Sequence, residues 1–342
     1  MITLISNVCK PEQGGVGRYS YEVIRRAKER QGFTVLDSSD LFGETATQKL
    51  FFIVAQRRKF LKMNRLSFGD VNHFLQVEIF YKVARGRHIV TFHNPPPFAK
   101  HNSYEQIRKD LLSMSTSLLF YTRYRAALRH ADLIVANSEF TREGVVEQGF
   151  DDDKVIVSFG GVSDDLQVTT KLSERNNTIG YVGSFAFHKR VGRLLAEMSS
   201  CAGSSLRRYR FELYGTKGIQ LEDLKRRYGN NAQLQFCGAL STDRLASVMN
   251  SFKALVMPSK WESFGLPIIE AVACGTPAFV YDDAEITPEV RKYTIEIGDV
   301  SQIPEELERL DEEDMIHMSR RVRDEFSWDT HFEVLTKAYG DP

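Results

Sequence analysis

Short apolar runs alternate with longer mixed stretches along most of the chain. Each run is too short for a helix and lies close to glycine, proline or helix-capping residues, so each is expected to form a buried strand of a parallel sheet. The intervening stretches are expected to form the crossover helices of βαβ units. The runs occupy residues 2–5, 33–36, 71–75, 89–92, 131–136 and 155–158, then 179–182, 211–214, 234–237, 254–257 and 278–281.

The clearest unit spans residues 257–280, M-P-S-K-W-E-S-F-G-L-P-I-I-E-A-V-A-C-G-T-P-A-F-V. Pro258 ends the first strand, and Pro267 suits the first turn of a helix because an N–H there has no intrahelical partner. Gly275 and Pro277 end that helix before the next apolar run. Ligands bind beyond the carboxyl ends of parallel strands, so the loop at 259–266 is the predicted site.

Two acids bracket that loop. Glu262 is within it and Glu270 is one turn inside the helix, so both carboxylates can face one crevice. Between them, Phe264, Gly265 and Leu266 offer backbone N–H groups at a helix N-terminus, which suits phosphate. Glutamates at this spacing alone are usually a solvated surface pair, but the residues between and after them favour a nucleotide-sugar site.

Composition narrows the class of protein. A chain of 342 residues suggests about two domains, and equal numbers of basic and acidic residues, 45 each, give no overall field that favours nucleic acid as a partner. The four cysteines are too far apart for a zinc site or a redox dithiol, so a reduced cytoplasmic compartment is expected. The opening M-I-T-L-I-S is interpreted as a strand, not a signal peptide, and no apolar run approaches the ~20 residues of a membrane span.

Two further features mark the first half of the chain. Gly14, Gly15 and Gly17 form a loop before a helix expected at residues 18–30, which is an anion-binding geometry without the spacing of a dinucleotide fingerprint. The loop also fits a simple strand-to-helix turn. His93 follows the strand at 89–92 directly and is therefore expected at the crevice edge of the sheet, although a lone histidine is more often structural.

Basic and apolar residues mix in two stretches, 47–64 and 118–129. Each can be an amphipathic helix on an anionic membrane surface or a surface helix that packs its apolar stripe on the sheet, and the second interpretation is favoured. Asp151, Asp152 and Asp153 superficially offer a metal motif. This run is expected in a solvated turn, where no other ligand is placed to complete an oxygen shell, so no metal site is predicted.

The segment E-S-F-G-L-P-I-I-E followed by A-V-A-C-G-T-P resembles the signature of the family 4 glycosyltransferases, retaining enzymes of the GT-B fold. Several segments, G-G-V-G, H-N, A-D-L-I-V-A-N-S, G-G-V-S-D and G-S-F-A-F-H-K-R, follow the family's order. The resemblance implies an α/β fold of two Rossmann-like, doubly wound domains that face each other across a cleft. An acceptor-binding domain would span 1–165, completed by a C-terminal helix at about 327–342, and a nucleotide-sugar domain would span 166–326.

The resemblance also implies roles for matching residues of the first domain. Gly15, Val16 and Gly17 would lie over the donor diphosphate and border the acceptor pocket. His93 would reach the donor sugar.

In the second domain, the resemblance implies that Lys189 binds the donor diphosphate, with Arg190 adding charge. The family usually has an arginine where this chain has Ser184, which leaves those two cations to neutralise the leaving group. Glu262 would bind sugar hydroxyls and Glu270 the ribose. Backbone contacts to the donor are implied at Gly183, Gly238, Leu240, Ser263, Phe264, Gly265 and Leu266.

The implied reaction is retaining transfer of a hexose from a UDP- or GDP-linked sugar to a hydroxyl of a glycan, lipid-linked or small-molecule acceptor. Front-face attack, in which the departing phosphate oxygen takes the acceptor proton, would explain retention. No metal and no cofactor are expected, because GT-B enzymes generally use no bound metal. A nucleotide-sugar 2-epimerase of the same fold and a non-catalytic sugar-binding protein are the alternatives. Neither the sugar nor the base can be identified from the sequence.

Overall fold

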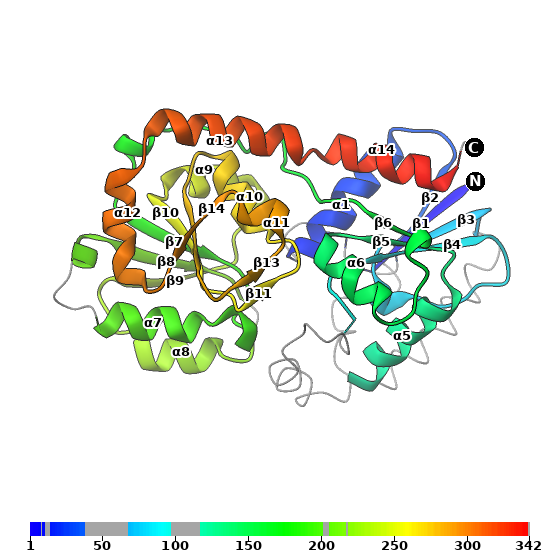
Figure 1. Ribbon diagram of the computed structural model, residues 1–342, viewed down its shortest axis with the longest axis horizontal. Coiled ribbons are helices and arrows are strands. Elements are labelled where there is room, and N and C mark those ends of the chain that lie inside the picture. Colours follow the sequence, from blue (N-terminus) through cyan, green and yellow to red (C-terminus); the bar gives the residue numbers. More distant parts are fainter. Residues whose placement is uncertain are drawn as a thin grey trace. The chain divides into compact units, whose positions relative to one another are not determined.

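The computed structural model describes residues 1–7, 9–10, 14–37, 68–96, 117–200, 205–216 and 218–340 (Figure 1). The chain forms two compact units. The first unit comprises residues 1–160 and 328–342, and the second unit comprises residues 161–327. These boundaries lie close to those expected after residues 165 and 326.

A parallel six-stranded sheet in the order β2-β1-β3-β4-β5-β6 forms the centre of the first unit. The strands are the expected apolar runs, and most of their side chains are buried because helices cover both faces of a doubly wound sheet. Their bounds are β1 (Ile2–Ser6), β2 (Phe33–Asp37), β3 (Val71–Phe74), β4 (Arg87–Phe92), β5 (Leu133–Ala136) and β6 (Val155–Val157).

The described helices of the first unit are α1 (Gly15–Lys28), α5 (Ser117–His130), α6 (Glu139–Val146) and α14 (Trp328–Tyr339). Helix α1 begins earlier than the expected Arg18, because Gly14 takes φ 96° as the N-cap and turns the chain before the other glycines. Gly15, Val16 and Gly17 therefore form the first helical turn. Stretch 118–129 lies in α5, whereas stretch 47–64 lies outside the described residues.

Buried polar contacts hold α14 in the first unit. His73 Nδ1 lies 2.7 Å from the Tyr339 hydroxyl, and His73 Nε2 lies 2.8 Å from Thr91 Oγ1. His331 Nδ1 lies 2.6 Å from Ser158 Oγ. Burial lowers the pKa of both His73 and His331 to about 3, so both rings are neutral near pH 7, and the His73 ring donates at one nitrogen and accepts at the other.

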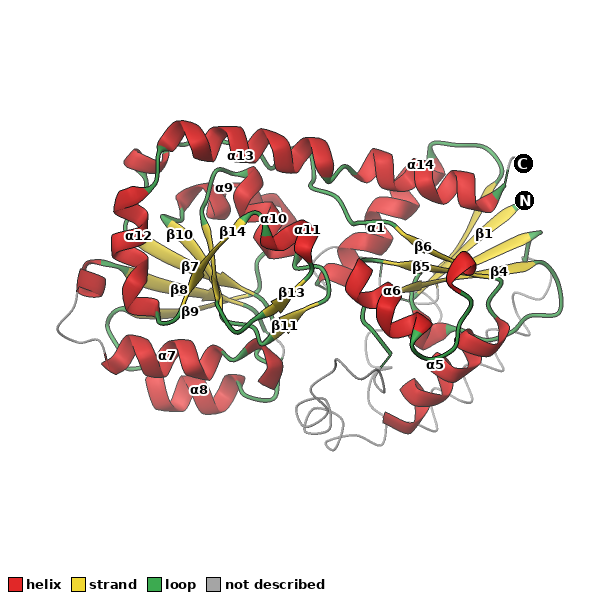
Figure 2. Ribbon diagram, in the orientation of Figure 1, coloured by secondary structure: helices red, strands yellow, loops and turns green. Residues whose placement is uncertain are grey.

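The second unit contains a parallel six-stranded sheet in the order β14-β12-β10-β7-β8-β9 and a two-stranded ladder of β11 and β13. Helices α7 and α8 lie on one side of the larger sheet and α9 and α10 on the other (Figure 2). The strands are β7 (Thr178–Val182), β8 (Arg210–Tyr214), β9 (Leu234–Gly238), β10 (Ala254–Met257), β11 (Trp261–Glu262), β12 (Ala278–Tyr281), β13 (Glu285–Ile286) and β14 (Thr294–Ile297). The helices are α7 (Val191–Ser200), α8 (Leu221–Tyr228), α9 (Thr242–Ser251), α10 (Leu266–Ala273), α11 (Pro288–Arg291), α12 (Ile303–Arg309) and α13 (Glu312–Glu325).

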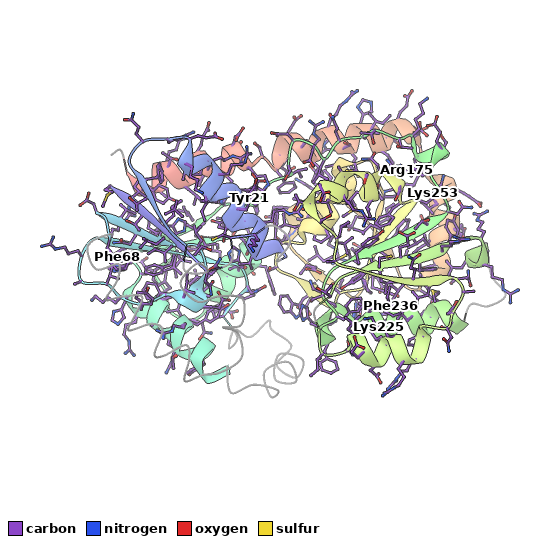
Figure 3. All side chains as sticks on the ribbon, turned by 180° about the vertical axis from the view of Figure 1, so that it is seen from behind. Tyr21, Phe68, Arg175, Lys225, Phe236 and Lys253 are labelled. Atoms are coloured by element: carbon purple, nitrogen blue, oxygen red, sulfur yellow. The ribbon has the colours of Figure 1, made fainter. Side chains whose placement is uncertain are left out.

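Arg175 lies beside Lys253 (Figure 3) and joins three segments of the second unit. Its buried guanidinium donates to the carbonyls of Thr170 (2.9 Å), Phe252 (3.2 Å) and Cys274 (2.6 Å). The segment before β7 is thereby attached to the ends of α9 and α10. No helix of the described residues has the length and apolar character needed to cross a membrane.

Candidate functional site

The expected strand, loop, helix and strand at residues 257–280 are present as β10, β11, α10 and β12. The loop is more ordered than the sequence indicates, because Trp261 and Glu262 pair as β11 with Glu285 and Ile286 of β13. This local ladder fixes the direction of Glu262, since successive side chains of a strand point to opposite faces. The loop follows β10, at the carboxyl edge of the larger sheet where ligands of such sheets bind.

Glu262 forms the centre of a buried cluster in the second unit. Its Oε1 and Oε2 accept hydrogen bonds from Lys189 Nζ at 2.6 and 2.7 Å, and Oε1 also accepts from Ser259 Oγ at 2.6 Å. Burial alone would raise the pKa of this carboxyl, which is 6% exposed, but the charge and hydrogen bonds of Lys189 and the Ser259 hydroxyl hold it below its ordinary value. The site therefore presents a carboxylate and an ammonium ion in direct contact.

The N-terminus of α10 lies directly after this cluster in the chain. Gly265 is the N-cap with φ 85°, a conformation that residues with a Cβ rarely adopt, and a Cβ there would also meet Ile268 Cδ1 at 3.0 Å. Ser263, Phe264 and Leu266 lead the chain into the helix. Pro267 has no N–H, and the Ile268 N–H donates to the Gly265 carbonyl at 2.9 Å, so the backbone donors that face out from this helix start belong to residues 263–266. Together with the helix dipole, these N–H groups favour an anion.

Glu270 lies one turn inside α10 and is 4% exposed. A carboxylate buried to this extent is stable only with polar partners, so contacts with neighbouring groups must hold Glu270 in this position. Glu262 on β11 and Glu270 on α10 thus both belong to the second unit and are both buried, so they are not a solvated surface pair.

The Arg190 side chain, expected to add charge at the donor diphosphate, contacts protein groups of the second unit. Its guanidinium donates to the carbonyls of Pro258 (2.8 Å) and Ser259 (3.1 Å), and to Asp283 Oδ2 and Oδ1 at 2.6 and 2.8 Å. These acceptors belong to the loops after β10 and β12, so the Arg190 guanidinium binds protein groups beside Glu262. Lys189 remains the cation of the cluster.

Glycines shape the neighbouring strand ends. At Gly183, after β7, a Cβ would lie 2.6 Å from the Tyr181 hydroxyl, which donates to the Ser184 carbonyl at 2.5 Å. At Gly238, at the end of β9, φ is 76°, and its carbonyl accepts from Gly215 N at 2.7 Å. Leu240, in the loop that follows β9, is partly buried.

In the first unit, His93 follows β4 and is 9% exposed. Its Nε2 lies 2.8 Å from the Leu75 carbonyl, and because a carbonyl only accepts, Nε2 carries the proton and Nδ1 keeps the lone pair. Burial lowers the pKa of His93 to about 4, so the ring is neutral near pH 7. Helix α1, with Gly15, follows β1 at the same edge of the sheet.

Sequence reasoning missed several residues around Glu262. Ser259 and the stack of His188 on Trp261, with ring centroids 4.7 Å apart, belong to the cluster, and Asp283 belongs to the Arg190 contact. Only Ser259 left a signal, since a hydroxyl placed three residues before a loop glutamate can orient it.

The acidic run at 151–153 participates in ion pairs, of Asp151 with Lys154 and of Asp152 with Arg142. Among the residues that the structure describes, no group of three or more histidine, cysteine, aspartate or glutamate side chains is arranged to hold a metal ion.

Two family models match consecutive parts of the chain: Glycosyltransferase Family 4 at residues 67–166 and Glycosyl transferases group 1 at residues 163–317. The serotype-specific mannosyltransferase WbdA of Escherichia coli is 30% identical over 173 residues, which cover 46% of this chain and 21% of that protein. The O-antigen chain mannosyltransferase B of Escherichia coli is 26% identical over 179 residues, 48% of this chain and 46% of that protein. The chain thus spans less than half the length of these curated relatives.

Solved structures resemble the whole chain. Anabaena Alr3699/HepE in complex with UDP and glucose has a TM-score of 0.69 at 14% identity, covering 100% of this chain and 99% of that chain. WaaG, a glycosyltransferase involved in lipopolysaccharide biosynthesis, has a TM-score of 0.71 at 12% identity and covers 100% of both chains. At such identities the likeness shows the fold, which is GT-B with two Rossmann-like domains. Adjoining family models and a matching fold make this chain a member of the family 4, group 1 glycosyltransferases.

Proposed function

We propose that the protein is a retaining glycosyltransferase that moves a hexose from a nucleoside diphosphate sugar to an acceptor hydroxyl without a metal ion. The observation that carries this proposal is the buried contact of Lys189 with Glu262. Glu262 follows β10 and precedes the N-terminus of α10, so its contact with Lys189 brings a cation, an acid and a helix N-terminus together. Membership of the family supports the same assignment.

The donor diphosphate requires positive charge where the leaving group forms. Lys189 and the N–H groups at the start of α10 would supply it, and such preorganised donors stabilise a developing anion more strongly than water does. Binding would draw the Lys189 ammonium toward phosphate. Glu262 could then accept hydrogen bonds from sugar hydroxyls, and Glu270 from the ribose.

His93 is proposed to contact the donor sugar as a neutral hydrogen-bond acceptor. With Nε2 donating to Leu75, Nδ1 is the acceptor atom of the neutral ring. The depressed pKa argues against a cationic role at neutral pH, because the ring would have to gain a proton in a buried position.

Retention is proposed to follow from front-face attack. The bond from the anomeric carbon to the phosphate oxygen breaks, a bond to the acceptor oxygen forms on the same face, and the acceptor proton passes to the departing phosphate. A glycosidase-like double displacement would need a carboxylate nucleophile beside the anomeric carbon. Glu262 is already held by Lys189 and Ser259, so front-face attack requires less rearrangement of the cluster.

The mannosyltransferase relatives and the UDP-glucose complex of HepE suggest GDP-mannose and UDP-glucose as first donors to test. The acceptor class, a glycan, lipid-linked or small molecule, stays a proposal. Peripheral contact with a membrane is also proposed, from exposed Tyr121 and neighbouring Arg125 on α5. Salt-sensitive pelleting with anionic vesicles tests this contact, and its absence would contradict it.

A thermal-shift screen against UDP, GDP and their sugar conjugates tests donor binding. Release of nucleotide in the presence of saccharide acceptors then tests transfer, and NMR of the new glycosidic bond gives its anomeric configuration. Stabilisation by one nucleotide family and product with the donor's configuration support the proposal. A protein stabilised by none of these ligands, or an inverted product, would contradict it. Addition of a chelator should leave the rate unchanged.

A further inference from the structure

Arg190 has an unusual backbone conformation. It follows the 3-10 turn η6 (Phe187–Lys189) with φ 46° and ψ 29°, and it is the single non-glycine residue with positive φ in the described part of the chain. A side chain with a Cβ is disfavoured there and persists only where the surrounding structure fixes it. Contacts of its side chain must therefore stabilise Arg190 in this backbone conformation.

The guanidinium joins two loops that follow neighbouring strands. It donates to the Pro258 and Ser259 carbonyls after β10, and it forms a two-pronged ion pair with Asp283 after β12. Hydrogen bonds from Arg190 lower the pKa of Asp283 to about 2, so the pair is ionised across the ordinary pH range. Lys260 Nζ also donates to the Asp283 carbonyl, at 2.9 Å.

The same loop carries the cluster of the proposed donor site. Arg190 holds the Ser259 carbonyl, the Ser259 hydroxyl donates to Glu262, and Glu262 binds Lys189. Two adjacent residues thus hold one loop, Lys189 through a side-chain carboxylate and Arg190 through the backbone. The Arg190 guanidinium, with its several N–H donors, acts as a fork. If this fork were removed, the Ser259 carbonyl would lose its donor, the backbone of Ser259 would be less fixed, and the Ser259 hydroxyl would no longer point steadily at Glu262.

We propose that Arg190, with Asp283 as its partner, is a positioning residue of the donor site, which fixes loop 258–262 so that Glu262 meets Lys189 where a nucleoside diphosphate sugar binds. This inference rests on the proposed function. In this role Arg190 holds the loop, whereas the alternative role is that of a cation in direct contact with the donor diphosphate. A lysine cannot replace a fork that bonds two carbonyls and a carboxylate at once, so the two roles predict different results for Arg190→Lys.

Calorimetric titration of the full chain with UDP and with GDP, from about pH 3.5 to pH 8 so that the range includes the titration of Glu262, tests the inference. Arg190→Gly removes the fork and relieves the left-handed backbone, because glycine adopts this conformation readily. Arg190→Lys keeps the charge without the fork, and Asp283→Asn weakens the ion pair. Arg208→Ala is the matched control, since Arg208 forms an exposed ion pair with Glu308 in the same unit.

Both Arg190 variants should weaken nucleotide binding roughly tenfold, as expected for the loss of hydrogen bonds that orient a binding group. They should also move the acid limb of the affinity profile to higher pH. Glu262 faces Lys189, His188 and Tyr181, and when the Ser259 hydroxyl no longer donates to it, it takes up a proton more readily. Asp283→Asn should act in the same direction but less strongly, and the control should match the wild type.

Wild-type affinity in Arg190→Lys together with weak binding in Arg190→Gly would overturn the inference, because charge alone would then suffice. An unmoved acid limb would also overturn it, since a clamp that only stabilises the unit changes the melting temperature and not the titration. Binding of nucleotide by the wild type and equally by all variants would refute the positioning role alone. A wild type that binds neither UDP nor GDP would refute the proposed function, and this inference with it.

Discussion

Replacing Lys189 by methionine should destabilise the second unit at neutral pH. The variant keeps Glu262 buried while removing the ammonium that contacts both carboxylate oxygens at 2.6 and 2.7 Å. Breaking a buried ion pair from one side costs about 3–5 kcal/mol, because it leaves an uncompensated charge. The two side chains are only 16% and 7% exposed, so solvent screens little of this effect, and about 3 kcal/mol is the expected minimum.

The pH dependence gives the sign of this effect. In the wild type the folded-state pKa of Glu262 is depressed, so its contribution to stability is present above its unfolded pKa of about 4.3 and is lost as pH falls through the lower folded value. In Lys189→Met, burial without the ammonium raises the folded pKa above the unfolded one. The variant is then least stable at neutral pH, and its deficit relative to the wild type shrinks as pH falls toward 5.

Fluorescence can follow the second unit by itself. The chain has two tryptophans, and a Trp328→Phe background leaves Trp261, which stacks on His188 next to Lys189. In a domain of this size, about 3 kcal/mol lowers the Tm by roughly 6–12 °C. The double variant Lys189→Met with Glu262→Gln removes both charges and should recover most of the loss, since the cycle isolates their interaction.

Equal stability of wild type and Lys189→Met at pH 7 would refute this reasoning. A double variant no more stable than the single one would also refute it, because the loss would then come from packing of the lysine stem.

Three further outcomes are expected. Glu270→Gln should abolish nucleotide-sugar binding in calorimetry with little change in the Trp261-detected Tm, and unchanged donor affinity would contradict the ribose role. The first unit, followed by Trp328 in a Trp261→Phe background, should lose about 1.4 kcal/mol per pH unit for each of His73, His93 and His331 as pH falls from 6.5 toward 4. Their depressed pKa values of about 3 to 4 confine their full contribution to pH above the unfolded value. His73→Gln should reduce the slope by roughly one third, and an unchanged slope would argue against this assignment. Arg175→Met should cost about 3 kcal/mol or more in urea unfolding of the second unit, because buried carbonyls lose their donor, and a cost no larger than that of Arg208→Ala would contradict this account.

The local signals in the chain were sufficient for three elements near the proposed donor site, but not for the ladder of β11 and β13. Pro258, Pro267 and Gly275 act within a few residues of themselves, through a fixed φ or a missing N–H, so β10, α10 and β12 could be predicted. The start of α1 was misplaced because glycines were interpreted as loop. Gly14 alone makes the turn, and Gly15 and Gly17 continue as helix.

Side-chain partners far apart in the chain could not be predicted. Lys189 and Glu262 are 73 positions apart, and Arg190 and Asp283 are 93 apart. Two adjacent cations look equivalent in sequence. The structure shows that their contacts differ. The left-handed backbone at Arg190 lets the guanidinium reach the loops after β10 and β12, whereas the Lys189 ammonium contacts the Glu262 carboxylate.

By itself the sequence determined the strands of the two large sheets apart from β14, most of the helices, the family signature and the candidate acids, because hydrophobic period, turn chemistry and capping act over short distances. Only the tertiary structure decided which cation binds Glu262, which one holds the loop backbone, and that His73 is buried against α14 while His331 of α14 is buried against Ser158. These facts depend on strand order and on crossovers that bring remote segments together, and no local pattern of residues encodes those distances.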